Sequence, residues 1–334
     1  MYARLMPDFT NHVSNAVLES MANADEKGAI EQVKEIYIDY FVVDPDLYIL
    51  KSPTIADIGL DEFKESQKEF LKYTEDSLFA VCMALRRVPN ITYSLESRIG
   101  RKLSERLSSR LEREYTQNHR DFLQESLDLV ILDRRDDALT PLVYNWSYLP
   151  MVNEFIGISN NSVLLDSTGN PKAKPLVFSR QTEDTFIEKN WNKNFGEFTT
   201  NLTTELENMC KEKHMAVKLD SLEDMQRAME KLPDLSKDAE KLKKHSDIIR
   251  FLTDQVSKND IYSVSQLQQD IITENNKQQQ LKDLLQIFLK KEVRSIDKLK
   301  LAMIYCLKYP DDPERVNGIQ RAAQAQNLSV VVQM

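Results

Sequence analysis

Glycine is scarce in this chain, with 7 residues out of 334, against an average usage of about 7%. No two glycines form a Gly-x-Gly pair. The dinucleotide-binding fingerprint and the P-loop are therefore excluded, since both need clustered glycines for the backbone to approach phosphates. Glycine is absent from residues 197–317. Because tight hairpins need positive φ angles, this stretch predicts helices, and the C-terminal third is expected to be all-α.

Charge and cysteine content narrow the class of protein. The 44 Lys and Arg residues are outnumbered by 53 Asp and Glu residues, giving a net charge of −9, which disfavours a nucleic-acid partner. Cys82, Cys210 and Cys306 have no paired spacing that would indicate a disulfide framework or a zinc site. The longest apolar run, residues 78–85, is far shorter than the ~20 residues of a membrane span. We therefore expect a cytoplasmic protein with buried, reduced thiols and no cofactor.

The first 125 residues alternate between helical and extended patterns, which is typical of α/β structure. The predicted elements are helices at 26–37, 61–86 and 95–115, and strands at 40–43 and 91–93. Residues 1–10 contain no clear first strand. The chain is therefore expected to begin inside an element and to be a fragment.

The best strand pattern is the run LDLVILD at residues 127–133, which is typical of a strand covered on both faces in a parallel sheet. A helix is predicted at 142–155, followed by extended runs at 162–165 and 175–178. This order resembles a βαβ unit, so a parallel sheet is predicted here. From about residue 182 the pattern is helical, with the helices expected at 195–215, 222–232, 235–256, 281–289 and 296–309.

The predicted helix at 235–256 has two features that bear on function. Its apolar side chains recur at three- and four-residue steps and form a long seam. Lys237, Lys241, Lys243 and Lys244 form a basic run on the same helix. The simpler interpretation is a buried seam and a solvated basic face. If the helix projects as a hairpin, part of the seam and the basic run would instead bind a partner helix.

A cluster of aspartates, Asp133, Asp136 and Asp137, lies just past the end of the 127–133 strand, where ligands bind in open α/β sheets. Such carboxylates could hold Mg²⁺ for phosphoryl chemistry. Arg134 and Arg135 lie between them and favour an Arg–Asp ion-pair and turn-capping network instead. The four histidines are far apart and no Gly-x-Ser-x-Gly elbow is present. No catalytic centre is predicted.

Part of the chain resembles a known signature. Residues 129–158 (LVILDRRDDALTPLVYNWSYLPMVNEFIGI) are similar to the signature of the Sec/Munc-type (SM) family, which regulates SNARE-mediated vesicle fusion. The matching residues are Leu132, Asp133, Arg134, Asp137, Thr140, Pro141, Leu142, Tyr148 and Met151. Supporting matches lie at 39–50, 86–94, 158–165, 192–198 and 221–235. Asn145–Trp146, residues 158–161 and residues 194–198 resemble the endosomal vacuolar protein sorting branch of the family.

The resemblance implies an incomplete, arch-shaped SM fold. Parallel-sheet α/β domains at the N-terminus and centre would be followed by an all-α helical arm. Residues 1–125 would form part of domain 1, residues 126–220 the first half of domain 2, and residues 221–334 a domain 3a-like helical region. The remaining segments of these domains would be missing from the chain.

The resemblance also implies a non-enzymatic function. The partners would be a syntaxin-type SNARE and the SNARE helical bundle, bound by a monomer that meets endosomal or Golgi membranes only through them. The implied SNARE-binding residues of the helical region are Met229, Leu232, Pro233, Leu235, Lys241, Leu242 and Lys244. A pocket for a syntaxin N-terminal peptide would fall near Val17, Leu18 and Met21. The signature residues Asp133, Arg134, Asp137 and Pro141 would be structural.

Two alternatives to SNARE binding stay open. The first is a Mg²⁺-dependent phosphohydrolase that uses Asp133, Asp136 and Asp137. The second is a truncated product with no activity of its own, because a parallel sheet that lacks strands exposes its edges and apolar face.

Overall fold

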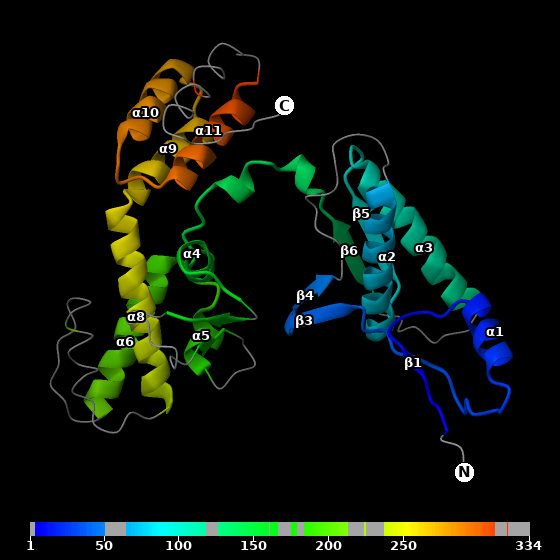
Figure 1. Ribbon diagram of the computed structural model, residues 1–334. Helices are drawn as coiled ribbons and strands as arrows, with labels where there is room; N and C mark the ends of the chain where they lie inside the picture. Colours follow the sequence, from blue (N-terminus) through cyan, green and yellow to red (C-terminus); the bar gives the residue numbers. More distant parts are fainter. Residues whose placement is uncertain are drawn as a thin grey trace. The chain divides into compact units, whose positions relative to one another are not determined.

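The computed structural model describes residues 4–50, 65–117, 126–159, 161–165, 175–178, 184–212, 224, 237–310 and 319. Contacts divide the chain into two compact units, Met1–Asp137 and Ala138–Met334 (Figure 1). The boundary between the compact units therefore lies between Asp137 and Ala138. The three-part division into 1–125, 126–220 and 221–334 stays a prediction.

The first unit combines short strands with long helices. Its elements are β1 (Asp8–Phe9), α1 (Asn15–Ala24), β2 (Lys34–Glu35), β3 (Tyr40–Asp44), β4 (Leu47–Leu50), α2 (Glu65–Leu85), β5 (Pro89–Tyr93), α3 (Arg98–Gln117), β6 (Leu127–Ile131) and the 3-10 turn η2 (Arg134–Asp136). The predictions of helices α2 and α3 and of strands β3, β5 and β6 are confirmed. Strands β3 and β4 form an antiparallel hairpin.

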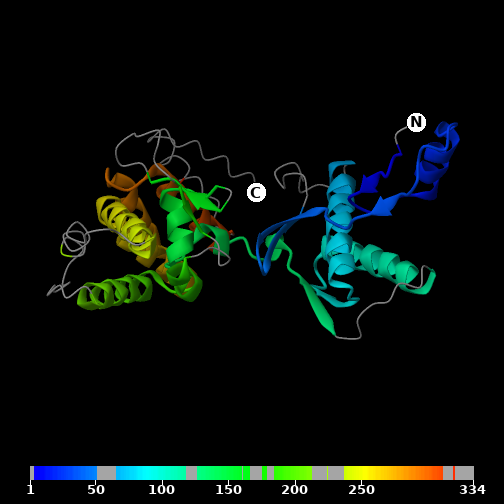
Figure 2. The ribbon, with the colours of Figure 1, turned by 90° about the horizontal axis from the view of Figure 1, so that it is seen from below.

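Strands β5 and β6 pair in parallel, with Ile91 opposite Leu129, and α2 and α3 pack beside them (Figure 2). Ile91 and Leu129 face the core formed by Phe79, Cys82, Met83, Leu107 and Leu111. Burial raises the pKa of the Cys82 thiol to about 11. Val130 is 58% exposed and Leu132 is 86% exposed. The expectation that β6 is covered on both faces is therefore wrong for the part of the chain that the structure describes.

The predicted helix at 26–37 is absent from the structure, which shows a turn followed by extended backbone. Gly28 has a φ of +58°, and Asp25 accepts hydrogen bonds from the N–H groups of Ala29 and Ile30. The following backbone then pairs with residues 5–10, which include β1 in parallel with β2. A short first strand therefore exists at Asp8–Phe9, contrary to the expectation for residues 1–10.

The second unit is mainly helical. Its elements are η3 (Thr140–Leu142), α4 (Tyr148–Phe155), β7 (Ser162–Val163), β8 (Leu176–Val177), α5 (Thr185–Asn190), α6 (Phe195–Glu212), α8 (Lys237–Lys258), α9 (Ile261–Thr273), α10 (Lys277–Leu289) and α11 (Ser295–Lys308). Strands β7 and β8 pair antiparallel, with Val163 opposite Leu176, and not in parallel as expected. The predicted helix at 222–232 lies outside the described residues except for Asp224, which is helical.

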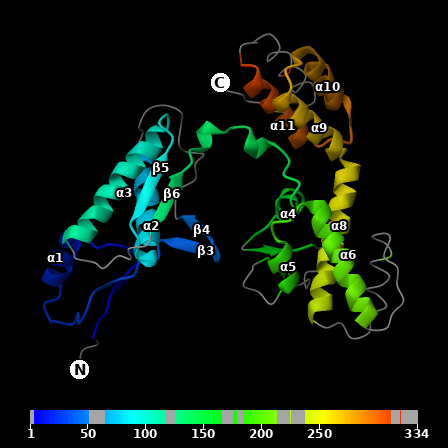
Figure 3. The same cartoon turned by 180° about the vertical axis from the view of Figure 1, so that it is seen from behind.

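Two hydrophobic clusters form the core of this unit. The first joins α4, α5 and α6 to α8 and contains Tyr148, Phe198, Leu242 and Ile249. The second joins α9, α10 and α11, which lie side by side in Figures 1 and 3. The prediction of an all-α C-terminal region is confirmed for residues 237–310, where every regular element is a helix. Among the described residues, no helix combines the length and the hydrophobicity that a membrane span requires.

Candidate functional site

The loop after β6 is fixed by the carboxylate of Asp133. This carboxylate accepts hydrogen bonds from the Ser97 hydroxyl at 2.7 Å and from the Arg135 guanidinium at 3.1 and 2.7 Å. It also accepts from the backbone N–H of Arg135, and Ser97 Oγ accepts from the N–H of Gly100 in the first turn of α3. The side-chain hydrogen bond from Arg135 is the largest influence on the Asp133 pKa and holds it well below its usual range. Asp133 thus joins the end of β6 to the start of α3.

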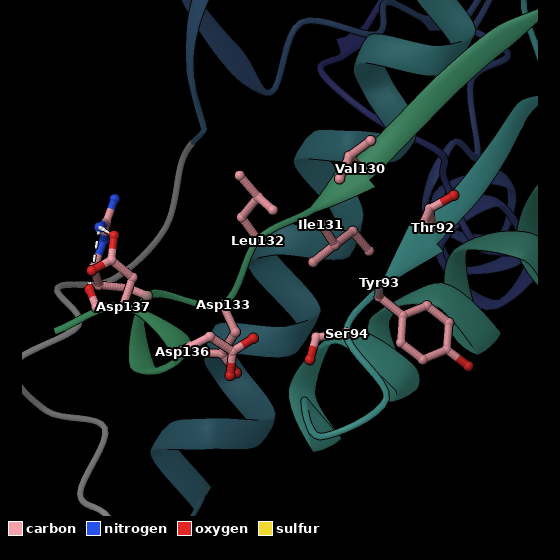
Figure 4. A pocket seen from close by; sticks show the side chains of 10 residues that line it. Thr92, Tyr93, Ser94, Val130, Ile131, Leu132, Asp133, Asp136 and Asp137 are labelled. Atoms are coloured by element: carbon pink, nitrogen blue, oxygen red, sulfur yellow. Dashed lines mark hydrogen bonds and ion pairs between the residues drawn. The ribbon is translucent and has the colours of Figure 1, made fainter. Parts of the chain in front are cut away.

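A pocket of about 460 Å³ lies at the carboxyl ends of β5 and β6 (Figure 4). Its walls come from Thr92, Tyr93, Ser94, Val130, Ile131, Leu132, Asp133, Arg134, Asp136 and Asp137. Asp137 forms an ion pair with Arg134 at 3.6 Å. The prediction of an Arg–Asp ion-pair and capping network in this loop is therefore confirmed.

The aspartates of this loop do not form a metal site in the structure. Four donor atoms already occupy the two oxygens of Asp133, which uses the lone-pair positions that a metal ion would need. Within the described residues, no three His, Cys, Asp or Glu side chains are grouped so that they could hold a metal ion. The geometry gives no support to the alternative of a Mg²⁺-dependent phosphohydrolase at Asp133, Asp136 and Asp137.

The second half of the signature is anchored in the helical unit. Pro141 lies in η3, which contacts α11. The buried side chain of Gln268 in α9 accepts from the Tyr144 N–H at 3.0 Å and donates to the Leu142 carbonyl at 3.1 Å. These bonds hold the backbone at Tyr144 and at the end of η3. Residues 143–147 are not helical, and the predicted helix at 142–155 begins only at Tyr148.

A polar network connects the segment before α4 with α11. The Tyr144 hydroxyl donates to the fully buried Asp297 at 2.5 Å, and the Arg294 guanidinium donates to Asp297 at 2.7 and 2.9 Å. Arg294 also bonds Glu154 at 2.8 Å, and Glu154 in turn pairs with Lys300 at 2.9 Å. Burial and the hydrogen bond to Asp297 raise the pKa of Tyr144. These charges are mutually compensated, which is how buried charges are tolerated.

A second buried chain of hydrogen bonds runs through the signature residue Tyr148. Its hydroxyl lies 2.9 Å from His245 Nδ1, and His245 Nε2 lies 3.2 Å from Asp184 Oδ2. All three residues are buried, and Tyr148 stacks on Phe198 with ring centroids 3.6 Å apart. Met151 belongs to the same core. The aromatic and Met positions of the signature are therefore core residues of the helical unit.

The predicted SNARE-binding residues of the helical region divide into three groups. Met229, Leu232, Pro233 and Leu235 lie outside the described residues. Lys241 and Lys244 are half-buried on α8, and Lys244 forms a 3.8 Å ion pair with Glu240. Leu242 is 3% exposed and belongs to the core with Ile249 and Tyr148. The expectation of an exposed seam is wrong for Leu242, because α6 and α4 cover this face of α8.

The other predicted partner site falls on α1, a helix without a buried residue. Val17 is 43% exposed, and Leu18 and Met21 are half-buried. Val17 and Met21 are four positions apart and so lie on one face of the helix. The structure brings these three apolar side chains together at the surface of the first unit.

Several side chains that anchor the signature segment were not identified from the sequence. Gln268 lies 124 positions from Tyr144, and His245 lies 97 positions from Tyr148. Short motifs do not contain such pairings. Arg294 and Asp297, at i and i+3, are the part of the network that local spacing could have indicated.

Comparison with known proteins agrees with this geometry. Residues 5–333 match the model of the Sec1 family. The chain is 30% identical over 303 residues to human vacuolar protein sorting-associated protein 45, covering 90% of this chain and 52% of that protein. It is 28% identical over 321 residues to the protein of the same name from Saccharomyces cerevisiae, covering 93% and 54%. The chain spans about half the length of the curated relatives that it matches.

Solved structures show the same similarity. The SM protein Vps45 in complex with the Qa SNARE Tlg2 (1–310) superposes with a TM-score of 0.77 at 27% identity, covering 96% of this chain and 58% of that one. The Unc18–syntaxin 1 complex from Monosiga brevicollis shares the fold, with a TM-score of 0.75 at 17% identity, covering 95% and 58%. The predicted SM fold is thereby confirmed. Because the family model matches residues 5–333 of the chain and the signature is built into both units, the chain belongs to the Sec1 family.

Proposed function

We propose that this chain binds a syntaxin-type SNARE and assists SNARE assembly during vesicle docking and fusion, in endosomal or Golgi transport. The observation that carries the proposal is the match to the Vps45 chain solved with the Qa SNARE Tlg2, which covers 96% of this chain. In this role the protein acts from the cytoplasm as a monomer without enzymatic activity. It reaches membranes through its SNARE partners.

Two surfaces of the chain are the proposed SNARE contacts. One is the apolar face of α1 formed by Val17, Leu18 and Met21, which suits a short apolar peptide. The other is the start of α8, where Lys241 and Lys244 suit acidic side chains of a partner helix. Met229, Leu232, Pro233 and Leu235 are proposed to extend this second surface. Leu242 is left out because it is a core residue.

The direct test is a binding titration of the whole 334-residue chain against residues 1–310 of Tlg2, the SNARE in the solved complex. We expect saturable binding, and we expect the two proteins to elute together as a single complex in gel filtration. If neither Tlg2 nor syntaxin 1 binds a folded sample, the proposal is wrong for this chain.

Matched variants locate the contact. Val17→Asp places a charge on the apolar face of α1, whereas Asn23→Asp adds the same charge elsewhere on this helix. On α8, Lys244→Glu is compared with Lys258→Glu at the far end of the same helix. Weaker binding for Val17→Asp or Lys244→Glu, with unchanged binding for its partner variant, would assign the contact to that surface. Equal effects within both pairs would exclude these two surfaces.

A further inference from the structure

The outward face of α3 is a basic stripe, although the chain as a whole has a net charge of −9. Along the margin of the first unit, α3 runs beside α2 (Figures 1 and 3). Residues spaced three or four positions apart, and some of their neighbours, lie on the outward face of this helix and are exposed. They are Arg98, Arg101, Lys102, Glu105, Arg106, Ser109, Glu112 and Arg113. The stripe therefore carries five basic and two acidic side chains.

The opposite face of α3 fixes the orientation of the stripe. Leu103, Leu107 and Leu111 are between 0% and 4% exposed. Leu107 and Leu111 belong to the hydrophobic core that α3 shares with α2. The Ser97 hydroxyl and Asp133 hold the start of the helix. Because the apolar face is already buried, α3 cannot insert it into another surface. Any partner of the stripe has to be attracted by charge.

Several cations of the stripe have no anionic partner among the residues that the structure describes. Arg98 and Arg101 make no side-chain hydrogen bond or ion pair among the described residues. Arg113 donates only to the Ser109 carbonyl at 3.3 Å. Arg106 is compensated by Glu75 at 2.6 Å. The uncompensated charge thus lies on both halves of the helix.

From this arrangement we propose that the outward face of α3 binds an anionic membrane surface directly. Clusters of four to eight basic residues on a helix are attracted to acidic lipid headgroups. A protein interface has an apolar centre inside a polar rim, and the stripe has no apolar side chain among its eight positions. The composition therefore favours headgroups over a protein partner. This direct contact would add to recruitment through SNARE partners, and it would replace the expectation that membranes are met only through them. It is separate from the proposed SNARE contacts on α1 and α8 and does not depend on them.

The test is vesicle flotation of the whole chain with phosphatidylcholine alone and with about 30 mol% phosphatidylserine. The triple variant Arg98→Gln, Arg101→Gln, Arg113→Gln removes the uncompensated cations. A matched control, Lys258→Gln, Lys282→Gln, Lys291→Gln, removes three exposed lysines of the second unit and changes the net charge equally. Thermal melts by circular dichroism check that both variants keep the fold of the parent.

The parent is expected to float with the anionic vesicles at about 0.1 M salt and to be released at about 1 M salt. The stripe variant should bind anionic vesicles about 100-fold more weakly than the parent, because each of the three charges removed weakens binding roughly fivefold. The control variant should bind like the parent. The proposal is overturned if the parent does not float with anionic vesicles or if both variants lose binding equally. Binding of the parent to a glutamate-rich peptide without flotation would assign the stripe to an acidic protein and would also overturn it.

Discussion

The side-chain amide of Gln268 forms two hydrogen bonds with the backbone before α4. It accepts from the Tyr144 N–H at 3.0 Å and donates to the Leu142 carbonyl at 3.1 Å. One buried side chain thereby replaces the backbone partners that a helix would have supplied. This relationship explains why the signature segment follows an extended path into the helical unit.

Gln268→Ala is expected to reduce the free energy of unfolding by about 2–4 kcal/mol, because it leaves a backbone donor and a backbone acceptor unsatisfied inside the protein. Urea denaturation followed by circular dichroism measures this change. Gln266→Ala on the same helix removes only an exposed hydrogen bond to Asp270 and should cost less than about 0.5 kcal/mol. Similar losses in the two variants would contradict the role of Gln268.

Arg294→Ala is expected to destabilise the chain by about 3–5 kcal/mol, because it removes one partner from a buried charge network. The fully buried Asp297 would lose its guanidinium and keep only the Tyr144 hydroxyl among the partners described above. Adding Asp297→Asn should recover part of this loss, since the unpaired charge is then absent. A double-mutant cycle by urea denaturation measures the coupling. Additive effects of the two changes would show that the residues act independently.

The free energy of unfolding should decrease at acid pH, because the carboxyl of Asp184 becomes protonated. Burial opposes ionisation of this carboxyl, but His245, the N–H of Ile187 and the charge of Lys241 together outweigh burial and hold its pKa below the ordinary value. The unfolded chain then binds more protons than the folded chain between the folded pKa and about pH 4, so stability rises with pH in that window. The contribution is full above the window and is lost as the pH falls through the folded pKa.

Asp184→Asn tests this pH dependence. The variant keeps an acceptor for the N–H of Ile187 but has no carboxyl group to titrate. Its urea midpoint should depend less on pH below about pH 4 than that of the parent. Asp254→Asn, at an exposed position of α8, is the control and should follow the parent. If all three curves run in parallel, Asp184 does not contribute to the acid response.

Asp133→Asn is expected to reduce the free energy of unfolding of the first unit by about 1–3 kcal/mol, because it weakens the charged hydrogen bonds to Arg135 and Ser97. Asp136→Asn, in an exposed side chain of the same loop, should change it by less than about 0.5 kcal/mol. The measurement is thermal unfolding of the whole chain with a probe in each unit. Equal effects at both positions would contradict the structural role of Asp133.

The sequence predicted the long helices because their apolar residues are regularly spaced and carry most of the packing. The helix wrongly expected at 26–37 shows where that signal fails. Ile30 and Tyr37 have helical spacing, but the turn at Gly28 and the carboxylate of Asp25 direct the backbone toward residues 5–10. Those partners lie more than 20 positions away, so local spacing does not reveal them.

The candidate site was predictable only in part, for a related reason. The ion pairs at Asp133 and Asp137 join neighbours in sequence, and spacing alone indicated them. Burial of Leu242 depends instead on α4 and α6 covering one face of α8. An amphipathic seam has the same pattern whether it meets the core of its own chain or a partner, so the sequence could not decide between them.

The compact boundary between Asp137 and Ala138 falls inside the signature by which the family is recognised. Its first half stabilises the end of β6 through Ser97 and Arg135, and its second half packs on α9 and α11. The signature is therefore two adjacent anchoring motifs, one for each unit. A cut between Asp137 and Ala138 would leave each unit with its own anchor, whereas a cut elsewhere within 129–158 would divide one of the two motifs.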